Sequence, residues 1–126
     1  MELGRAIYQA EAHSGVGGPG TAARSGDLLL GALAACAQVT CQMVATAMAV
    51  PIRSITVAVE GELDLRGTLG LAKDAPVGFD RIALSFAIDA PEATAEQLAA
   101  LREKTEQYCV VLQTLQHSPA ISAVWS

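Results

Sequence analysis

The stretch LLLGALAACAQVTCQMVATAMAV, residues 28–50, decides the fold of this chain. It contains no charged residue and is long enough to span a bilayer as one helix. However, it is rich in alanine, carries polar side chains at Gln38, Thr40, Gln42 and Thr46, and has no asymmetry of flanking positive charge. We therefore expect a helix buried at the centre of a soluble assembly, packed against the same helix of a second copy.

The composition of the 126-residue chain predicts a single folded domain over residues 1–126. Apolar residues make up 52% and charged residues 17%, which excludes intrinsic disorder. The net charge of −5 and the lack of a Lys/Arg cluster argue against nucleic-acid and anionic-membrane partners. Three cysteines, with no apolar signal-peptide block at the start, predict free thiols in a reducing cytoplasm.

Periodicity and turn residues predict an α+β fold in the order β-α-β-β-α-β. Ser25 or Asp27 caps the first helix, which stops near residue 49, before Pro51. Thr94 begins the second helix, with Gln97 as its capping-box partner. The remaining predicted elements are strands at 5–13, 52–62, 82–88 and 120–125, loops at 15–20 and 63–79, and a helix end at about residue 116.

The cysteines are the side chains that could carry redox chemistry. Cys36 and Cys41 are five positions apart on the first helix, so they point about 140° apart and cannot pair with each other. Cys109 lies within the second predicted helix. Each cysteine could equally be a small buried apolar residue, because a catalytic role requires a thiolate with a lowered pKa and access to solvent.

Other candidate motifs are weaker. His13 and His117 stand beside turn residues, without partners at metal-ligand spacing, so we expect solvated loop histidines and no metal or cofactor. The segment SGVGGPG at 14–20 lacks the lysine of a phosphate-binding loop and indicates a connector.

Two segments together resemble one known family. SGDLLLGALAAC, at 25–36, resembles the x-P-E-x-L-L-x-A-L-x-A-C start of the central helix in the OsmC/Ohr family of organic hydroperoxide reductases. EQYCVVLQTL, at 106–115, resembles that family's second-cysteine helix, C-P-V-x-x-x-L. The resemblance covers about residues 17–125 and implies an OsmC-like fold in an intertwined homodimer, whose long apolar helices cross at its centre.

The resemblance also implies an activity, with active sites at the subunit interface. Cys36 would be the peroxidatic thiolate that attacks a small organic hydroperoxide and becomes a sulfenic acid. Cys109 would then form a disulfide with it, which a dithiol reductant of the lipoamide type reduces. Cys41 has no counterpart in the family and is expected in the core.

The chain departs from the family at several positions. Gly26 stands where the family has a catalytic glutamate, and the neighbouring Asp27 is the candidate substitute. The chain is shorter before its first cysteine, and Arg5 and Arg24 are the only basic residues there. Val110 replaces the family's proline. Without a nearby cation, we expect the pKa of Cys36 to stay ordinary or to rise on burial.

Three functional hypotheses follow. The first is a cytoplasmic thiol-dependent peroxidase acting through Cys36, Cys109 and Asp27. The second is a non-catalytic OsmC-like dimer that binds a small apolar ligand or acts as a redox-responsive partner. The third is a small membrane protein, which the acidic charge and the flanking amphipathic strands disfavour.

Overall fold

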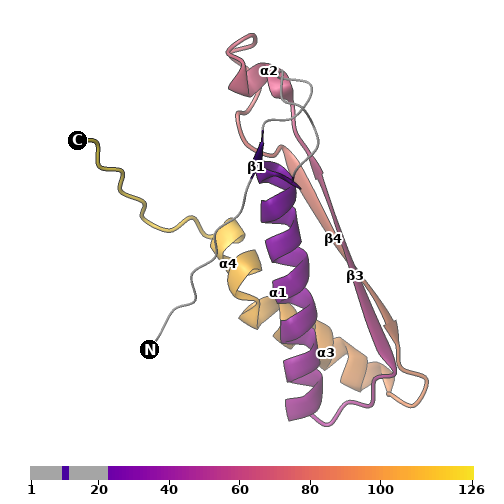
Figure 1. Ribbon diagram of the computed structural model, residues 1–126. Helices are drawn as coiled ribbons and strands as arrows, with labels where there is room; N and C mark the ends of the chain where they lie inside the picture. Colours follow the sequence, from indigo (N-terminus) through magenta and orange to yellow (C-terminus); the bar gives the residue numbers. More distant parts are fainter. Residues whose placement is uncertain (1–9, 12–22) are drawn as a thin grey trace. The chain divides into compact units, whose positions relative to one another are not determined.

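The computed structural model describes residues 10–11 and 23–126. The elements in chain order are β1 (Ala10–Glu11), β2 (Ala23–Arg24), α1 (Ser25–Ala47), β3 (Ser54–Glu62), α2 (Leu65–Thr68), β4 (Arg81–Asp89), α3 (Ala95–Tyr108) and α4 (Val110–Gln116) (Figure 1). They form two compact units: one holds the described residues up to 31 together with 60–83, and the other holds 32–59 and 84–126.

Helix α1 ends two residues before the predicted position, in a Schellman turn. The N–H of Val50 donates to the carbonyl of Ala45 at 2.9 Å, and the N–H of Ala49 donates to that of Thr46 at 3.2 Å. Ala49 adopts a positive φ of 54°, a conformation that glycine reaches more easily than alanine. Val50 is buried immediately after the turn, which anchors this end of the helix.

Strands β3 and β4 form a two-stranded antiparallel sheet. The N–H of Arg53 donates to Asp89 at one end, and the N–H of Asp80 donates to Glu62 at the other. Along both strands, half-buried side chains alternate with exposed ones. The sequence prediction of both strands is confirmed to within two residues at each end.

In the first unit, glycines make room for an aromatic ring. A Cβ atom at Gly61 would lie 2.7 Å from the Phe79 ring, and one at Gly26 would lie 3.0 Å from it. Because neither glycine has a side chain, the Phe79 ring can pack directly against the backbone at both positions. The same unit holds the short parallel pairing of Ala10 with Ala23 in β1 and β2.

The predicted loop at 63–79 contains a short helix, α2, so that prediction was wrong for residues 65–68. Asp64 caps α2 by accepting a hydrogen bond from the N–H of Arg66 at 3.0 Å. The Arg66 guanidinium also pairs with the Asp64 carboxylate at 2.7 Å. This ion pair lowers the pKa of Asp64, through hydrogen bonds from Arg66 above all. Of the predicted strand at 5–13, only Ala10–Glu11 is described, and the loop at 15–20 and His13 lie outside the described residues.

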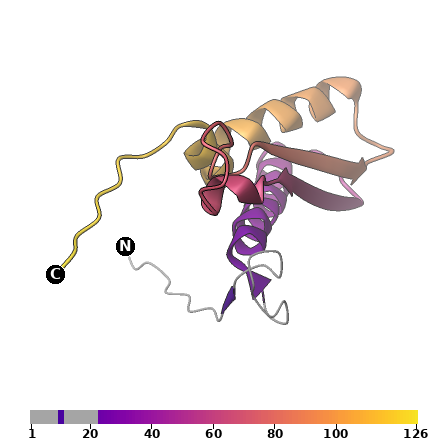
Figure 2. The same cartoon turned by 90° about the horizontal axis from the view of Figure 1, so that it is seen from above.

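The second unit holds the core. Cys41, Ala45, Val50 and Leu101 are buried together, so α1 and α3 meet there, and half-buried Ile55, Phe86 and Ile88 from the hairpin pack against them. Figure 2 shows α3 running beside the two strands. The buried side chains of this core are therefore small or aliphatic, and the Phe86 ring packs against them.

Helix α1 buries one stripe of its surface, at Leu33, Ala37, Cys41 and Ala45. Val39 and Met43, on the opposite face, are 53% and 66% exposed. The helix is also long and apolar enough to cross a membrane, by length and composition alone. We expected the whole helix to be buried, but within this chain only one face of it is buried.

The predicted second helix is two helices. It begins as predicted, with a capping box in which Thr94 Oγ1 accepts from the Gln97 N–H and Gln97 Oε1 accepts from the Thr94 N–H. It breaks at Cys109, whose backbone is extended at φ −73° and ψ 108°, and α4 follows (Figure 1). The prediction of one continuous helix was therefore wrong.

The predicted strand at 120–125 was also wrong. Residues 118–126 form no helix or strand and extend away from α4 (Figure 1). Ile121, Val124 and Trp125 are each at least 85% exposed, although all three are apolar. A strand requires a neighbour for its backbone N–H and C=O groups, and the described residues of this chain supply none here.

Candidate active site at the paired cysteines

The two cysteines that the sequence singles out meet in the second unit. Cys36 lies on α1 and is half-buried, whereas Cys109 lies at the junction of α3 and α4 and is buried. Their thiols interact, since each affects the ionisation of the other. Both are free thiols in the described structure, so the site is in its reduced state.

The break at Cys109 turns the start of α4 toward Cys36. In a continuous helix the Glu106 carbonyl would accept from the N–H of Val110, four residues later. Here the Gln113 side chain donates to the Glu106 carbonyl instead, at 2.8 Å. Cys109 is the N-cap residue of α4 and makes no side-chain capping bond, although the N–H groups of Leu112 and Val111 act to lower its pKa.

The N–H groups at the start of α4 also act on the ionisation of Cys36. Burial raises the pKa of Cys36, but four groups favour the thiolate and lower this pKa overall. They are, from the largest effect to the smallest, the Val111 N–H, the Cys109 thiol, the Thr40 hydroxyl and the Val110 N–H. Thr40 Oγ1 lies 3.9 Å from the sulfur, one helical turn along α1. The expectation that this pKa stays ordinary or rises without a cation was therefore wrong, because backbone dipoles stabilise the thiolate here.

Cys109 has the opposite electrostatic character. Burial raises the pKa of the Cys109 thiol, and the neighbouring Cys36 sulfur raises it further. The pair thus consists of one sulfur that loses its proton readily and one that keeps it. A protonated Cys109 can donate a hydrogen bond to the Cys36 thiolate. This arrangement suits a nucleophilic cysteine beside a second cysteine that can form a disulfide with it.

Asp27, the third predicted site residue, belongs to the first unit. Asp27 lies nine residues before Cys36 on α1. It lies beside Leu30 and Phe79. The predicted role of Asp27 stays a prediction.

Cys41 and His117 lie where the sequence predicts. Cys41 is buried in the core, and burial raises the pKa of its thiol. His117 ends α4 in an exposed position, with Nδ1 3.3 Å from the Gln113 carbonyl. Within residues 10–11 and 23–126, no group of His, Cys, Asp and Glu side chains is arranged to hold a metal ion.

Sequence reasoning missed the groups that stabilise the thiolate. Thr40 could have been found, because residues four apart lie on one helical face. The N–H groups of Val110 and Val111 could not, because neither glycine nor proline marks the break at Cys109.

The comparisons with known proteins identify the family of the chain. The family model for OsmC-like proteins matches residues 18–124. The chain belongs to the OsmC-like family. The match takes in both cysteines and Asp27, and it confirms the resemblance from which the α+β fold and the site were predicted.

Solved structures give the same fold. An OsmC-like protein from Mycoplasma pneumoniae aligns at a TM-score of 0.67 with 22% identity, over 78% of this chain and 65% of that one. An organic hydroperoxide resistance protein, OsmC, from Legionella pneumophila aligns at 0.65 with 19% identity, over 85% of this chain and 72% of that one. The chain thus spans less than two thirds of the length of the first protein and somewhat more of the length of the second. No curated protein matches the chain.

Family membership bears on the exposed helix α1, because OsmC-like proteins are generally soluble. The prediction of one domain over residues 1–126 stays a prediction, as does the homodimer.

Proposed function

We propose that this OsmC-like protein is a thiol-dependent peroxidase that reduces organic hydroperoxides in the cytoplasm. The supporting observation is the Cys36 sulfur, whose pKa is lowered by the first N–H groups of α4 while Cys109 stays protonated beside it. A two-cysteine peroxidase requires at least a nucleophilic thiolate and a second thiol next to it. The family's redox and stress-response character supports the same assignment.

The first step forms an S–O bond and breaks an O–O bond. The Cys36 thiolate attacks the terminal oxygen of the hydroperoxide, and the alkoxide leaves and takes up a proton as the alcohol. Cys36 is oxidised to the sulfenic acid, and the hydroperoxide is reduced by the same two electrons. The N–H groups of Val110 and Val111 would hold the anionic sulfur in place before the attack.

The second step joins the two cysteines. The Cys109 sulfur attacks the sulfenic sulfur of Cys36, the S–O bond breaks, and the oxygen leaves as water. An external dithiol of the lipoamide type then reduces the disulfide by exchange and is itself oxidised to a disulfide. The raised pKa of Cys109 keeps this thiol protonated, and so less competitive for peroxide, until Cys36 is oxidised.

We also propose that the working form is a homodimer in which the exposed face of α1 packs against a second copy. Val39 and Met43 on this face are more than half exposed although they lie on a helix with no charged residue after Asp27. Gly31 is also open, since a Cβ atom there would meet nothing within 4 Å. A helix face of small and apolar residues favours close contact with another helix.

The experiment is a turnover assay with matched cysteine variants. We would follow NADH consumption through a lipoyl reductant with cumene hydroperoxide, for the wild type and for Cys36→Ser, Cys109→Ser and Cys41→Ser. The first variant should lose turnover, the second should lose turnover that depends on the dithiol, and the third should keep it. Turnover that survives Cys36→Ser would eliminate the proposal.

A thiol titration separates this function from a non-catalytic binder. The peroxidase should show one cysteine, Cys36, that reacts quickly with an alkylating agent near neutral pH. A non-catalytic dimer would show three slow cysteines, and that result would count against the proposed function even if the fold is right.

A further inference from the structure

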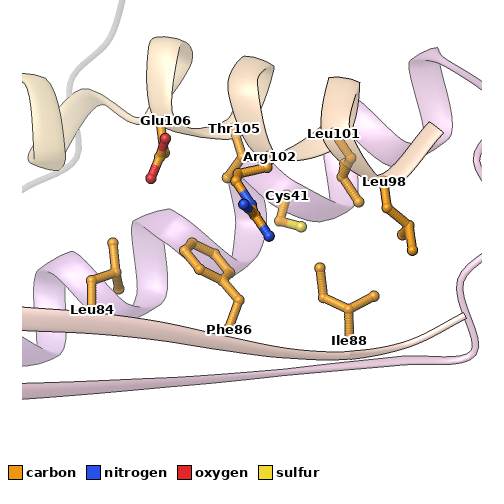
Figure 3. A pocket seen from close by; sticks show the side chains of 9 residues that line it. All are labelled: Cys41, Leu84, Phe86, Ile88, Leu98, Leu101, Arg102, Thr105 and Glu106. Atoms are coloured by element: carbon orange, nitrogen blue, oxygen red, sulfur yellow. The ribbon is translucent and has the colours of Figure 1, made fainter. Parts of the chain in front are cut away.

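A pocket in the second unit lies apart from the cysteine pair, since neither Cys36 nor Cys109 lines it. It encloses about 490 Å³, a size typical of small-molecule sites. Its walls come from β4 and α3, which face each other across it, with Cys41 of α1 at the back (Figure 3). The apolar walls are formed by Leu84, Phe86, Ile88, Leu98 and Leu101.

A buried hydroxyl in this pocket lacks a partner. Thr105 is 2% exposed, and its Oγ1 atom makes no hydrogen bond with any described residue. Thr105 lowers the pKa of the neighbouring Cys41 thiol, but the two side chains do not reach hydrogen-bonding geometry, and a thiol is a poor partner in any case. Buried hydroxyls are normally paired, and this oxygen is closed to solvent, so a polar group of a ligand would reach it once the Thr105 side chain turns toward the pocket.

A cation reaches into the same space. The Arg102 side chain descends from α3 toward the middle of the pocket and ends near Cys41 and Phe86 (Figure 3). Within the described part of the chain, its guanidinium lies within 4.0 Å of no carboxylate, including that of Glu106 one turn later on the same helix. A guanidinium without a partner, above an apolar pocket, is suited to bind a carboxylate.

We propose that this pocket binds a small monocarboxylate with an apolar body. The carboxylate pairs with the Arg102 guanidinium and accepts a hydrogen bond from Thr105 Oγ1, and the body lies against the five apolar side chains of β4 and α3. Glu106, on the other side of the mouth, repels a head group of higher charge such as a phosphate monoester. The site is independent of the proposed peroxidase, because it uses none of that reaction's cysteines.

The test uses octanoate and octan-1-ol, which share a chain and differ in charge. We would titrate each into the full-length protein, measuring affinity by calorimetry and location by amide chemical shifts. Octanoate should bind saturably and shift amides of β4 and α3 around Phe86 and Leu101. Octanol should bind more weakly, because it has no charge to pair with Arg102.

Three variants separate the contributions. Arg102→Gln should weaken octanoate roughly tenfold or more and leave octanol unchanged, as expected for loss of a charge-assisted pair. Lys104→Gln, a matched cation on the same helix outside the pocket, should change neither. Thr105→Val should weaken octanoate several-fold without unfolding the protein, which a melting curve would check.

Several results would overturn the proposal. One is an absence of saturable octanoate binding, including the case in which a second copy fills the pocket and protects its amides from exchange. Another is octanoate affinity that survives Arg102→Gln, which would indicate non-specific adsorption. Octanoate binding should persist in a Cys36→Ser, Cys109→Ser double variant, so this proposal and the peroxidase can fail separately.

Discussion

At position 110 this chain has valine where the family has proline, and this difference favours the thiolate of Cys36. A proline, which the family carries here, has no N–H, whereas the Val110 N–H helps to lower the pKa of Cys36. Proline is compatible with the first position of α4, and the extended backbone of Cys109 suits a residue before proline. The substitution Val110→Pro therefore removes one N–H with little disturbance.

We expect Val110→Pro to raise the pKa of Cys36 and to slow its alkylation at pH values below that pKa. The sign follows from the wild type: the lowered pKa means that the Cys36 thiolate is present at a pH where Cys41 and Cys109, whose pKa values are raised, remain thiols. The measurement is the rate of iodoacetamide labelling at each cysteine against pH, by mass spectrometry. Val110→Ala keeps the N–H and should match the wild type; equal profiles for all three proteins would contradict this account.

Thr105 offers a prediction about stability. Because its buried hydroxyl has no hydrogen-bond partner, Thr105→Val should raise the free energy of unfolding by about 1 kcal/mol, the order of cost for an unpaired buried polar group. Thr114→Val is the control, because the Thr114 hydroxyl is exposed and donates to the Val110 carbonyl at 2.7 Å. Urea unfolding of both variants measures the difference. A stability loss in Thr105→Val would show that the hydroxyl is satisfied in solution.

At the residue scale, sequence reasoning predicted which residues meet but not what activates them. Cys36 and Cys109 could be chosen from family motifs, and Cys41 could be assigned to the core from the helical angle. The lowered pKa of Cys36 depends on backbone groups that are set by the path of the chain rather than by a side-chain type.

The C-terminal turn of α1 carries a conformational cost that a single substitution removes. Ala49 occupies the left-handed position of the Schellman turn, where glycine is usual. Ala49→Gly should therefore raise the free energy of unfolding by about 0.5–1 kcal/mol. The melting temperature, measured by calorimetry, should rise with it.

Ala47→Gly is the matched control, two residues earlier and still helical. It should lower stability by up to about 1 kcal/mol, because glycine has more backbone entropy to lose in a helix. Loss of stability in both variants would mean that the left-handed conformation of Ala49 is absent in solution.

Most elements could be predicted, and the failures share a cause. The strands at 52–62 and 82–88 alternate clearly, and Thr94 with Gln97 marks a helix start, so these predictions were confirmed. The break at Cys109 has no glycine or proline to mark it, since the Gln113 side chain compensates the lost backbone bond. The short helix α2 depends on the Asp64–Arg66 pair, which lies within the segment that the sequence predicts to be a loop.

At the scale of the whole molecule, the apolar face of α1 predicts self-association. Met43→Glu should shift the protein from dimer toward monomer, because burying an unpaired carboxylate in a helix contact costs several kcal/mol. Sedimentation equilibrium measures the change. Thr56→Glu, on the exposed side of β3, should leave the mass unchanged. A monomeric wild type, or a dimer that tolerates Met43→Glu, would contradict the proposed contact.

The sequence pointed to a partner for α1 because a charge-free helix is rarely left exposed, and one chain covers only a stripe of it. It could not predict the fate of residues 120–125, whose alternation is typical of a strand. A strand forms only where another strand offers its edge, and that is a property of the assembly rather than of local sequence.

The most direct test of the central claim is to treat the reduced protein with one equivalent of cumene hydroperoxide and map its disulfides by mass spectrometry. The peroxidase proposal predicts a single product, a disulfide joining Cys36 to Cys109, with Cys41 still a free thiol and one equivalent of alcohol released. Protein that leaves the peroxide unreacted, or that oxidises Cys41 in preference to Cys36, would contradict it.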